Sequence, residues 1–294
     1  MAGALLVVSF AVMVAGAAVF TNAVEWAGLR LGLGHGAVGS VLAAVATAMP
    51  ESLIPVIAII TEGKQAGPVA IGAIVGAPFL LATLAMAVCG FSALIYRGRR
   101  ASPRLQPDRN AIARDLYVVL GALLLAISIG LVGSRPLRLA GAAVLVATYA
   151  AVTWKTIVQG RQEGGAELFV RSIEQLAHGL RVDPLILTLV IAPLATELPE
   201  TLNSVIWVRQ GKDTLALGNI TGALVLQSMP LVAFGMVFTS WRLTSPALAA
   251  MLAALAGAAL SLVAVLRARG WSAPFVGWSA GLYVGGITAI IAVT

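Results

Sequence analysis

The sequence predicts an all-α, polytopic membrane protein with about ten transmembrane helices arranged as two inverted five-helix repeats. Three observations support this fold class: few charged residues, long apolar segments and an internal repeat. Of the 294 residues, 60% are hydrophobic and 11% are charged, whereas a soluble domain usually carries about 25% charged residues. A lipid bilayer is therefore the expected solvent for most of the chain.

Many apolar segments approach the ~20 residues with which an α-helix crosses a bilayer. They are rich in Ala, Leu and Gly and lack the alternation of a membrane β-barrel. We predict ten spans, at 3–28, 36–61, 67–95, 114–133, 136–157, 163–180, 183–208, 213–239, 246–267 and 273–293. The sixth, 163–180, is amphipathic, so its full insertion stays open.

Basic residues predict the orientation, because cytoplasmic connections carry an excess of Lys and Arg. The connection 97–114 holds six arginines, and we predict that it is a basic loop in the cytoplasm. Counting outward from this loop places thirteen of the nineteen basic residues on its side and five on the other, with Arg171 inside a span. Both termini then lie outside the cytoplasm, and we expect the inner (cell) membrane of a bacterium. The formal charge of +7 is explained by these connections, so no nucleic-acid partner is expected.

An internal repeat becomes visible when Glu51 is aligned with Glu200. Residues 17–57 then match 166–206 without a gap, and after a short slip Gly72 and Gly76 fall on Gly218 and Gly222. We predict two approximate halves of one membrane domain, 1–133 and 134–294, with the first repeat's five spans reaching about residue 157 and the second repeat beginning at about 163. Because each copy has an odd number of spans, the second copy enters the membrane inverted relative to the first. Inverted repeats are a known architecture of secondary transporters, whose binding sites lie near the membrane midplane.

The strongest chemical signal is a Pro-Glu pair in the middle of one apolar helix in each copy. The copies read Ala-Thr-Ala-Met-Pro-Glu, ending at Glu51, and Ala-Thr-Glu-Leu-Pro-Glu, ending at Glu200. Carboxylates at that depth cost ~2.5 kcal/mol or more and indicate function, while proline opens the helix before them. Carboxylate, hydroxyl and carbonyl oxygens suit Na⁺ or Ca²⁺. The candidate ligands here are Glu51, Glu200, Glu197, Thr47 and Thr196. A neutral, hydrogen-bonded carboxyl is the alternative for either glutamate alone.

A second element follows in each copy, as Gly72–Gly76 and Gly218–Gly222. The glycines are explained equally well by close helix packing. The second copy adds polar side chains at Asn219, Thr221 and Gln227, where the first has Ala73, Val75 and Leu81. We include Asn219 and Gln227 among the candidate ligands, and a helix–helix hydrogen bond remains an equal explanation for Gln227.

At these residues the chain resembles the cation/calcium exchanger superfamily, of the sodium/calcium exchanger type. Members have two inverted five-helix halves, each with a Gly-Thr-Ser-x-Pro-Glu stretch and a later Gly-Asn-x-x-Gly-Ser-Asn stretch. The resemblance implies that Glu51 and Glu200 are the central cation ligands, with oxygens from Thr47 and Thr196 beside them. The family's serines are replaced by Ala48 and Glu197 in the first stretch and by Ala77 and Ala223 in the second. Sodium-coordinating positions are therefore lost and one acid is gained.

We accordingly predict a secondary-active cation antiporter, not an enzyme, that exchanges Ca²⁺ or another cation against Na⁺ or H⁺. One alternative is a proton-coupled exchanger of another divalent cation, favoured by the pair Glu197 and Glu200, since close carboxylates resist joint ionisation. Another is a non-transporting membrane protein that retains the exchanger fold. The expected partners are inorganic cations and the lipid bilayer, with no cofactor besides the transported cations and the oligomeric state open.

Overall fold

A computed structural model gives the structure of the chain over residues 67–99, 104–161, 198–267 and 273–293. Eight isolated positions before residue 67 are also described: Trp26, Arg30, Val38, Ala43, Pro55, Val56, Ile59 and Ile60. These residues are helical apart from the turns that join the helices, and no β-strand occurs among them. The all-α prediction is confirmed for this part of the chain.

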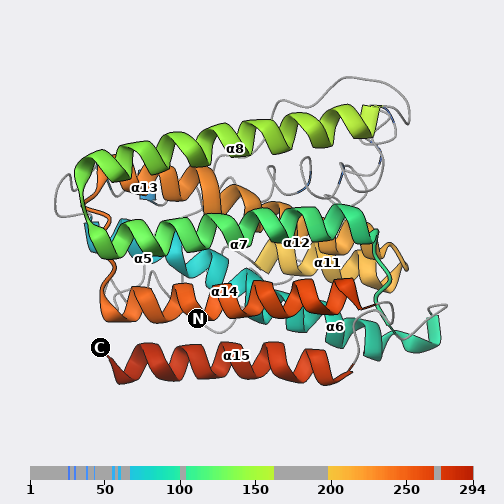
Figure 1. Cartoon of the computed structure of the whole chain (residues 1–294). Coiled ribbons are helices and arrows are strands. Elements are labelled where there is room, and N and C mark those ends of the chain that lie inside the picture. Colours follow the sequence, from blue (N-terminus) through green and yellow to red (C-terminus); the bar gives the residue numbers. More distant parts are fainter. Residues whose placement is uncertain are drawn as a thin grey trace, which may run out of the picture.

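The helices follow one another as long rods joined by short turns (Figure 1). In chain order they are α5 (Gly67–Leu80), the π-helical turn η3 (Leu81–Ala85), α6 (Met86–Ile95), the 3-10 turn η4 (Arg97–Arg99), α7 (Arg109–Val132), α8 (Arg135–Arg161), α11 (Leu198–Arg209), α12 (Asp213–Leu226), the π-helical turn η6 (Gln227–Leu231), α13 (Val232–Phe238), α14 (Ser245–Leu266) and α15 (Ala273–Ala292).

Six helical segments of the described residues are long and apolar enough to cross a membrane. They are Ala70–Ile95, Arg109–Val132, Arg135–Ile157, Asp213–Phe238, Ser245–Leu266 and Phe275–Ala292. These correspond to the predicted spans three, four, five, eight, nine and ten. The predicted spans 3–28, 36–61 and 163–180, and most of 183–208, lie outside the described residues, so the arrangement of ten spans stays a prediction.

Helix α7 begins at Arg109, whereas the hydropathy pattern placed the start of this span at 114. The cause is an N-cap, because the Asp108 carboxylate accepts hydrogen bonds from the backbone N–H groups of Asn110 (2.8 Å) and Ala111 (3.2 Å). A polar first turn can thus be helical before the apolar part of the span begins. The connection predicted at 97–114 is correspondingly shorter.

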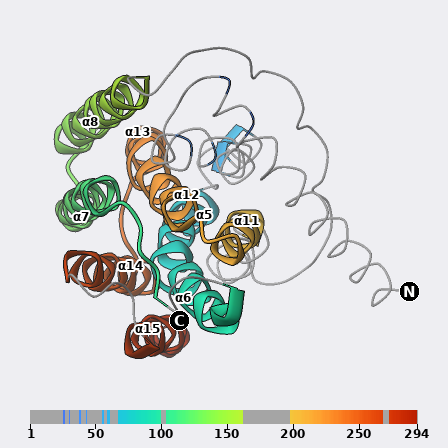
Figure 2. The same ribbon diagram turned by 90° about the vertical axis from the view of Figure 1, so that its right-hand side faces the viewer.

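A central pair of segments forms the interior of the described structure. In the span Ala70–Ile95, 89% of the residues in the most apolar stretch are buried. In Asp213–Phe238 the corresponding share is 78%. The remaining spans flank this pair in the order α8, α7, α14 and α15 (Figure 2). The outermost, Arg135–Ile157 and Phe275–Ala292, are only 17% and 22% buried, so most of their surface is apolar and faces outward, as lipid-facing helices require.

Basic side chains gather at one end of the helices. Figure 1 shows that α6 ends, and α7 and α12 begin, at the same end of the bundle. The exposed or half-buried basic residues near this end are Arg97, Arg104, Arg109, Lys155, Arg209, Lys212 and Arg267. Near the opposite end, the described ranges hold Arg135, Arg138 and Arg242. The charge asymmetry inferred from the connections is therefore present in three dimensions.

Candidate functional site

The two central segments share an irregularity at matched positions. Each consists of a 14-residue α-helix followed by a five-residue π-helical turn, η3 beginning at Leu81 and η6 at Gln227. The alignment that pairs Gly72 with Gly218 also pairs Leu81 with Gln227. The duplicated sequence thus forms duplicated local structure, and π-helical turns of this kind are frequent at functional sites.

A proline lies within or shortly before each π-helical turn. Pro230 lies inside η6 and Pro78 lies three residues before η3. A proline lacks the backbone N–H and its ring clashes with the carbonyl of the preceding turn, so the regular α-helical ladder cannot continue there. In η3 the Thr83 hydroxyl also donates to the Phe79 carbonyl oxygen (2.5 Å). Each segment therefore lacks one backbone donor near its middle.

The two segments run antiparallel and meet around these turns. Helix α5 contacts η6 and α13, while α12 contacts η3 and α6. The first part of each segment therefore packs against the last part of the other. This is the local arrangement that two inverted copies require, and it holds for the part of the repeat that the structure describes.

Helix α11, which contains Glu200, forms a hairpin with α12. A tight turn joins them, with Gly211 in the left-handed region (φ 76°). The Ser204 hydroxyl donates to the Ala216 carbonyl oxygen (2.9 Å) and accepts a hydrogen bond from Asn219 Nδ2 (3.2 Å). The Pro-Glu helix and the helix of the second element are therefore joined by polar contacts inside the protein.

The structure places the predicted site residues unequally. Asn219 and Gln227 are 0% exposed and lie in the central antiparallel pair, Gln227 being the first residue of η6. Glu200 lies in the first turn of α11. The other candidates, Glu51, Thr47, Thr196 and Glu197, lie outside the described residues, so their convergence on one site stays a prediction. Both glycine pairs, Gly72 with Gly76 and Gly218 with Gly222, are buried, as close packing of the helices requires.

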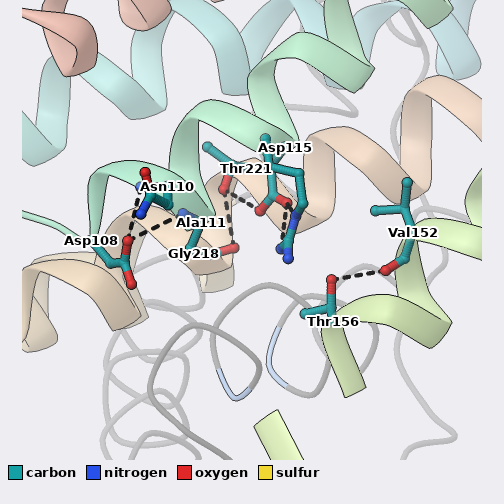
Figure 3. Close-up of polar contacts among 9 residues, drawn as sticks. Asp108, Asn110, Ala111, Asp115, Val152, Thr156, Gly218 and Thr221 are labelled. Carbon is teal, nitrogen blue, oxygen red and sulfur yellow. Dashed lines mark hydrogen bonds and ion pairs between the residues drawn. The ribbon is translucent and has the colours of Figure 1, made fainter. Parts of the chain in front are cut away.

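A buried acid that the sequence interpretation missed lies beside α12 (Figure 3). Asp115, on α7, is 1% exposed. Its Oδ2 accepts a hydrogen bond from the Thr221 hydroxyl (3.0 Å), and its Oδ1 accepts from Arg114 Nε (3.1 Å) and Nη2 (2.8 Å). The adjacent Arg114 made Asp115 resemble an ordinary charged residue of a connection, and only burial distinguishes it. Thr221 therefore joins α12 to α7 through its hydroxyl hydrogen.

The segment before α7 binds the beginning of α12. The Gln106 backbone N–H donates to Asp213 Oδ2 (2.7 Å), and the Asp108 N–H donates to the Thr214 hydroxyl (2.8 Å). Leu105, the residue before Gln106, is fully buried. Helix α12 is thus bonded to this segment at its start, to α7 through Thr221 and to α11 through Asn219, and its rotation about its own axis is defined from three sides.

Polar oxygens, but no cluster of metal-binding side chains, occur in this described part of the site. Among the described residues, no group of three or more His, Cys, Asp or Glu lies close enough to hold a metal ion. The candidate ligands that the structure describes with their side chains are the amide groups of Asn219 and Gln227. Such neutral, hard oxygens suit Na⁺ and Ca²⁺ when carboxylates complete the set.

Comparison with known families gives one match over almost the whole chain. The model of the family described as "Sodium/calcium exchanger protein" matches residues 1–158 and 163–291. A search of curated proteins finds no match. The family model thus covers both halves of the internal repeat.

Solved structures with the same fold agree with this match. The sodium-calcium exchanger NCX_Mj, soaked with 2.5 mM Na⁺ and 1 mM Sr²⁺, superposes with a TM-score of 0.71 at 16% identity, covering 96% of each chain. Native YfkE has a TM-score of 0.63 at 15% identity, covering 95% of this chain and 89% of the other. The H⁺/Ca²⁺ exchanger CAX has a TM-score of 0.60 at 14% identity, covering 95% and 84%. At these identities the similarity establishes the fold alone.

Proposed function

Because the chain belongs to the sodium/calcium exchanger protein family, we propose that it exchanges Ca²⁺ or another cation against Na⁺ or H⁺ through a carboxylate site near the membrane midplane. Family membership makes it an integral membrane protein and a transporter of inorganic cations, not an enzyme. The choice of cations and the residues of the site are the parts that we propose.

The observation that carries the proposal is the antiparallel pair of duplicated segments with matched π-helical turns. Each segment contains a proline that removes one backbone donor, and the second copy adds the buried amides of Asn219 and Gln227. The hydrogen bond between Ser204 and Asn219 ties these groups to the helix of Glu200. Neutral oxygens are thus assembled beside the helix that supplies one of the two proposed carboxylates.

We propose that Glu51 and Glu200 neutralise most of the charge of the bound cation. Thr47 and Thr196 would add hydroxyl or carbonyl oxygens, and Asn219 and Gln227 amide oxygens. Two acidic groups and several neutral oxygens match the ligand preference of Ca²⁺, and the same set can bind Na⁺. Competition of two cation species for one site, together with alternating access of that site to the two sides, produces exchange without ATP.

Alternating access needs a part of the protein that moves against the buried pair. We propose that the first and sixth predicted spans, 3–28 and 163–180, slide against the core formed by spans two, three, seven and eight. The basic end of the bundle would face the cytoplasm and both termini the other side. The described part of the core, α5 to α6 and α11 to α13, is joined by packing and by polar contacts, as a scaffold for such motion requires.

Proton coupling is a second candidate for one specific reason. Glu197 and Glu200 are three residues apart in the second copy, where the first copy has Ala48 and Glu51. Two carboxylates on one helical turn resist simultaneous ionisation unless a cation lies between them, so release of a divalent ion would favour uptake of a proton. One protein of the same fold is named an H⁺/Ca²⁺ exchanger.

Transport by the purified protein in liposomes tests both candidates. Vesicles loaded with Ca²⁺ should release it when Na⁺ is added outside, or when a pH gradient is imposed, and not when choline replaces Na⁺ at constant pH. Release that follows the pH gradient and ignores Na⁺ would select proton coupling. Absence of Ca²⁺, Na⁺ and other divalent-cation movement under every gradient would overturn the proposal.

A further inference from the structure

Helix α11 contains a buried polar side chain, Asn203, that is not among the proposed ligands and whose burial has no evident reason in packing. Asn203 is 1% exposed, and its Oδ1 accepts no hydrogen bond from any residue of the described chain. Buried amide oxygens are paired in the great majority of cases, so an unpaired one calls for a physical reason. An amide carbonyl oxygen without a donor has the chemistry of a ligand for a hard cation.

The helix places Asn203 beside the proposed site. The buried positions among the α11 residues with described side chains are Thr201, Asn203, Ser204, Trp207 and Val208, which follow one face of the helix with a spacing of three and four residues. Position 200 lies three residues before Asn203 and four before Ser204, so the helical period places this position of the backbone on the same face of α11. Asn203 is therefore one helical turn from Glu200, on the side of the basic end.

The neighbouring contact shows what this face of α11 meets. Ser204 bonds to Ala216 and Asn219 of α12, so this face is directed at the second element of the same repeat. Along α11, Asn203 thus lies between position 200 and Ser204, the residue that contacts Asn219. Along the helix, Asn203 is one turn nearer to the basic end than position 200.

Comparison of the two copies also supports a role for Asn203 as a ligand. Asn203 aligns with Ile54, so the first copy has an aliphatic side chain at this position. The second copy is likewise the polar one at Asn219 and Gln227, which align with Ala73 and Leu81. The extra oxygens thus collect in the second copy, and the Asn203 side chain belongs to that pattern.

We infer that Asn203 Oδ1 is a further cation ligand, which binds Na⁺ or Ca²⁺ on the basic-end side of Glu200. This inference rests on the proposed exchange function. It extends the site by one turn of α11 and makes the second half the source of most neutral ligands.

An isosteric substitution separates a ligand from a packing residue. Asn203→Leu removes the oxygen at nearly constant volume. If Asn203 only fills space, loss of an unpaired buried polar group leaves stability equal or higher and does not affect cation binding. If it is a ligand, the cation-free protein is equally stable or more stable, while the KM for the cation rises about tenfold with little change in kcat, because a charge–dipole contact is lost.

A second variant and a control complete the experiment. Asn203→Asp should increase the thermal stabilisation by Ca²⁺ relative to that by Na⁺, because it adds a charge to the same position. Asn110→Leu, at an exposed position on α7, should change neither the KM nor the cation-induced shift in melting temperature. An Asn203→Leu protein with wild-type KM and wild-type stabilisation by cations would overturn the inference.

Binding and flux readouts keep the two proposals distinguishable. If the wild type is stabilised by Ca²⁺ or Na⁺ but moves neither, exchange fails, and the stabilisation of Asn203→Leu still decides the ligand role. If neither cation stabilises the wild type, the role of Asn203 as a ligand is overturned as well. If the wild type exchanges cations and Asn203→Leu matches it, only the ligand role is lost.

Discussion

At the scale of single residues, burial converts ordinary polar side chains into determinants of structure. Asp115 is tolerated inside the protein because Thr221 and Arg114 donate hydrogen bonds to both of its carboxylate oxygens. A buried charge without such partners is strongly unfavourable. The same logic makes Asn203 conspicuous, since its oxygen lacks a donor among the described residues.

Removing the Thr221 donor should destabilise the protein. In Thr221→Val the Asp115 Oδ2 stays buried and loses its hydrogen bond, at a cost of about 1–3 kcal/mol. Thr221→Ser should retain most of the stability, because the hydroxyl remains. The measurement is thermal unfolding in detergent, with Ser128→Ala as control, because the Ser128 hydroxyl bonds only within exposed α7 surface. Equal melting temperatures for Thr221→Val and wild type would contradict this role of the contact.

The two proposed carboxylates give a prediction about transport at the same scale. Glu51→Gln and Glu200→Gln should each reduce cation exchange by more than roughly 100-fold, since even outer partners of bound metals act at 10–100-fold. Asp108→Asn is the matched control, because asparagine also caps helices and this carboxylate is exposed. Exchange at wild-type rates in both glutamine variants would refute the carboxylate site and favour a protein that only retains the fold.

At the scale of helices, the π-helical turns depend on close packing by neighbouring elements. Gly257 of α14 lies against the backbone of η3, where a Cβ atom would collide with the Ala82 carbonyl. The absence of a side chain at this position lets α14 support the turn that the first copy contributes to the proposed site. The backbone of Ala82 cannot move aside as the end of a flexible side chain can. The close contact between α14 and η3 therefore requires glycine at position 257.

Two glycine-to-alanine variants test this requirement. Gly257→Ala should destabilise the protein by about 1–3 kcal/mol, the cost of overpacking a well-packed interior, and should also lower transport, because η3 is displaced. Gly121→Ala is the matched control on α7, where an added Cβ meets nothing within 4 Å. Alanine is the better helix former by up to about 1 kcal/mol, so the control should be neutral or slightly stabilising. A stable and fully active Gly257→Ala protein would show that the close approach is dispensable.

At the scale of the whole molecule, charge and burial organise the protein along two directions. Along the helices, basic residues concentrate at the end where α6 ends and α7 begins (Figure 1). Across the helices, burial falls from the central antiparallel pair to the peripheral α8 and α15 (Figure 2). The first direction predicts the orientation in the membrane, and the second places the proposed ion path away from the lipid.

Labelling of introduced cysteines should reveal the orientation. Arg104 and Arg242 are exposed at opposite ends of the bundle, and Cys89, the chain's only cysteine, is buried. An impermeant maleimide added to intact cells should label Arg242→Cys and leave Arg104→Cys unmodified until the membrane is opened. The unmodified wild type serves as control. The reverse pattern would show that both termini face the cytoplasm, because the topology is then inverted as a whole.

Of the candidate site, the sequence identified the members of the second element and missed the contacts that hold them. Asn219 and Gln227 stood out because their aligned partners are apolar, and both are buried in the central pair. Asp115 and Asn203 did not, because a charge next to Arg114 and an asparagine near a span end are ordinary in a linear sequence. Whether a polar group has a partner is a property of neighbours distant in the chain.

The chain's composition and the length of its apolar segments determined by themselves that this is a helical membrane protein, and its repeat predicted the duplicated central segments. The hydrophobic effect and the need to satisfy backbone hydrogen bonds in lipid act on every residue of a span, so they are readable locally. Only the tertiary structure decided that the duplicated segments pack antiparallel around matched π-helical turns, that Asp115 bonds to α12 and that the buried Asn203 oxygen has no donor among the described residues. These features depend on which faces of the helices meet, and packing between segments more than a hundred residues apart in the sequence decides that.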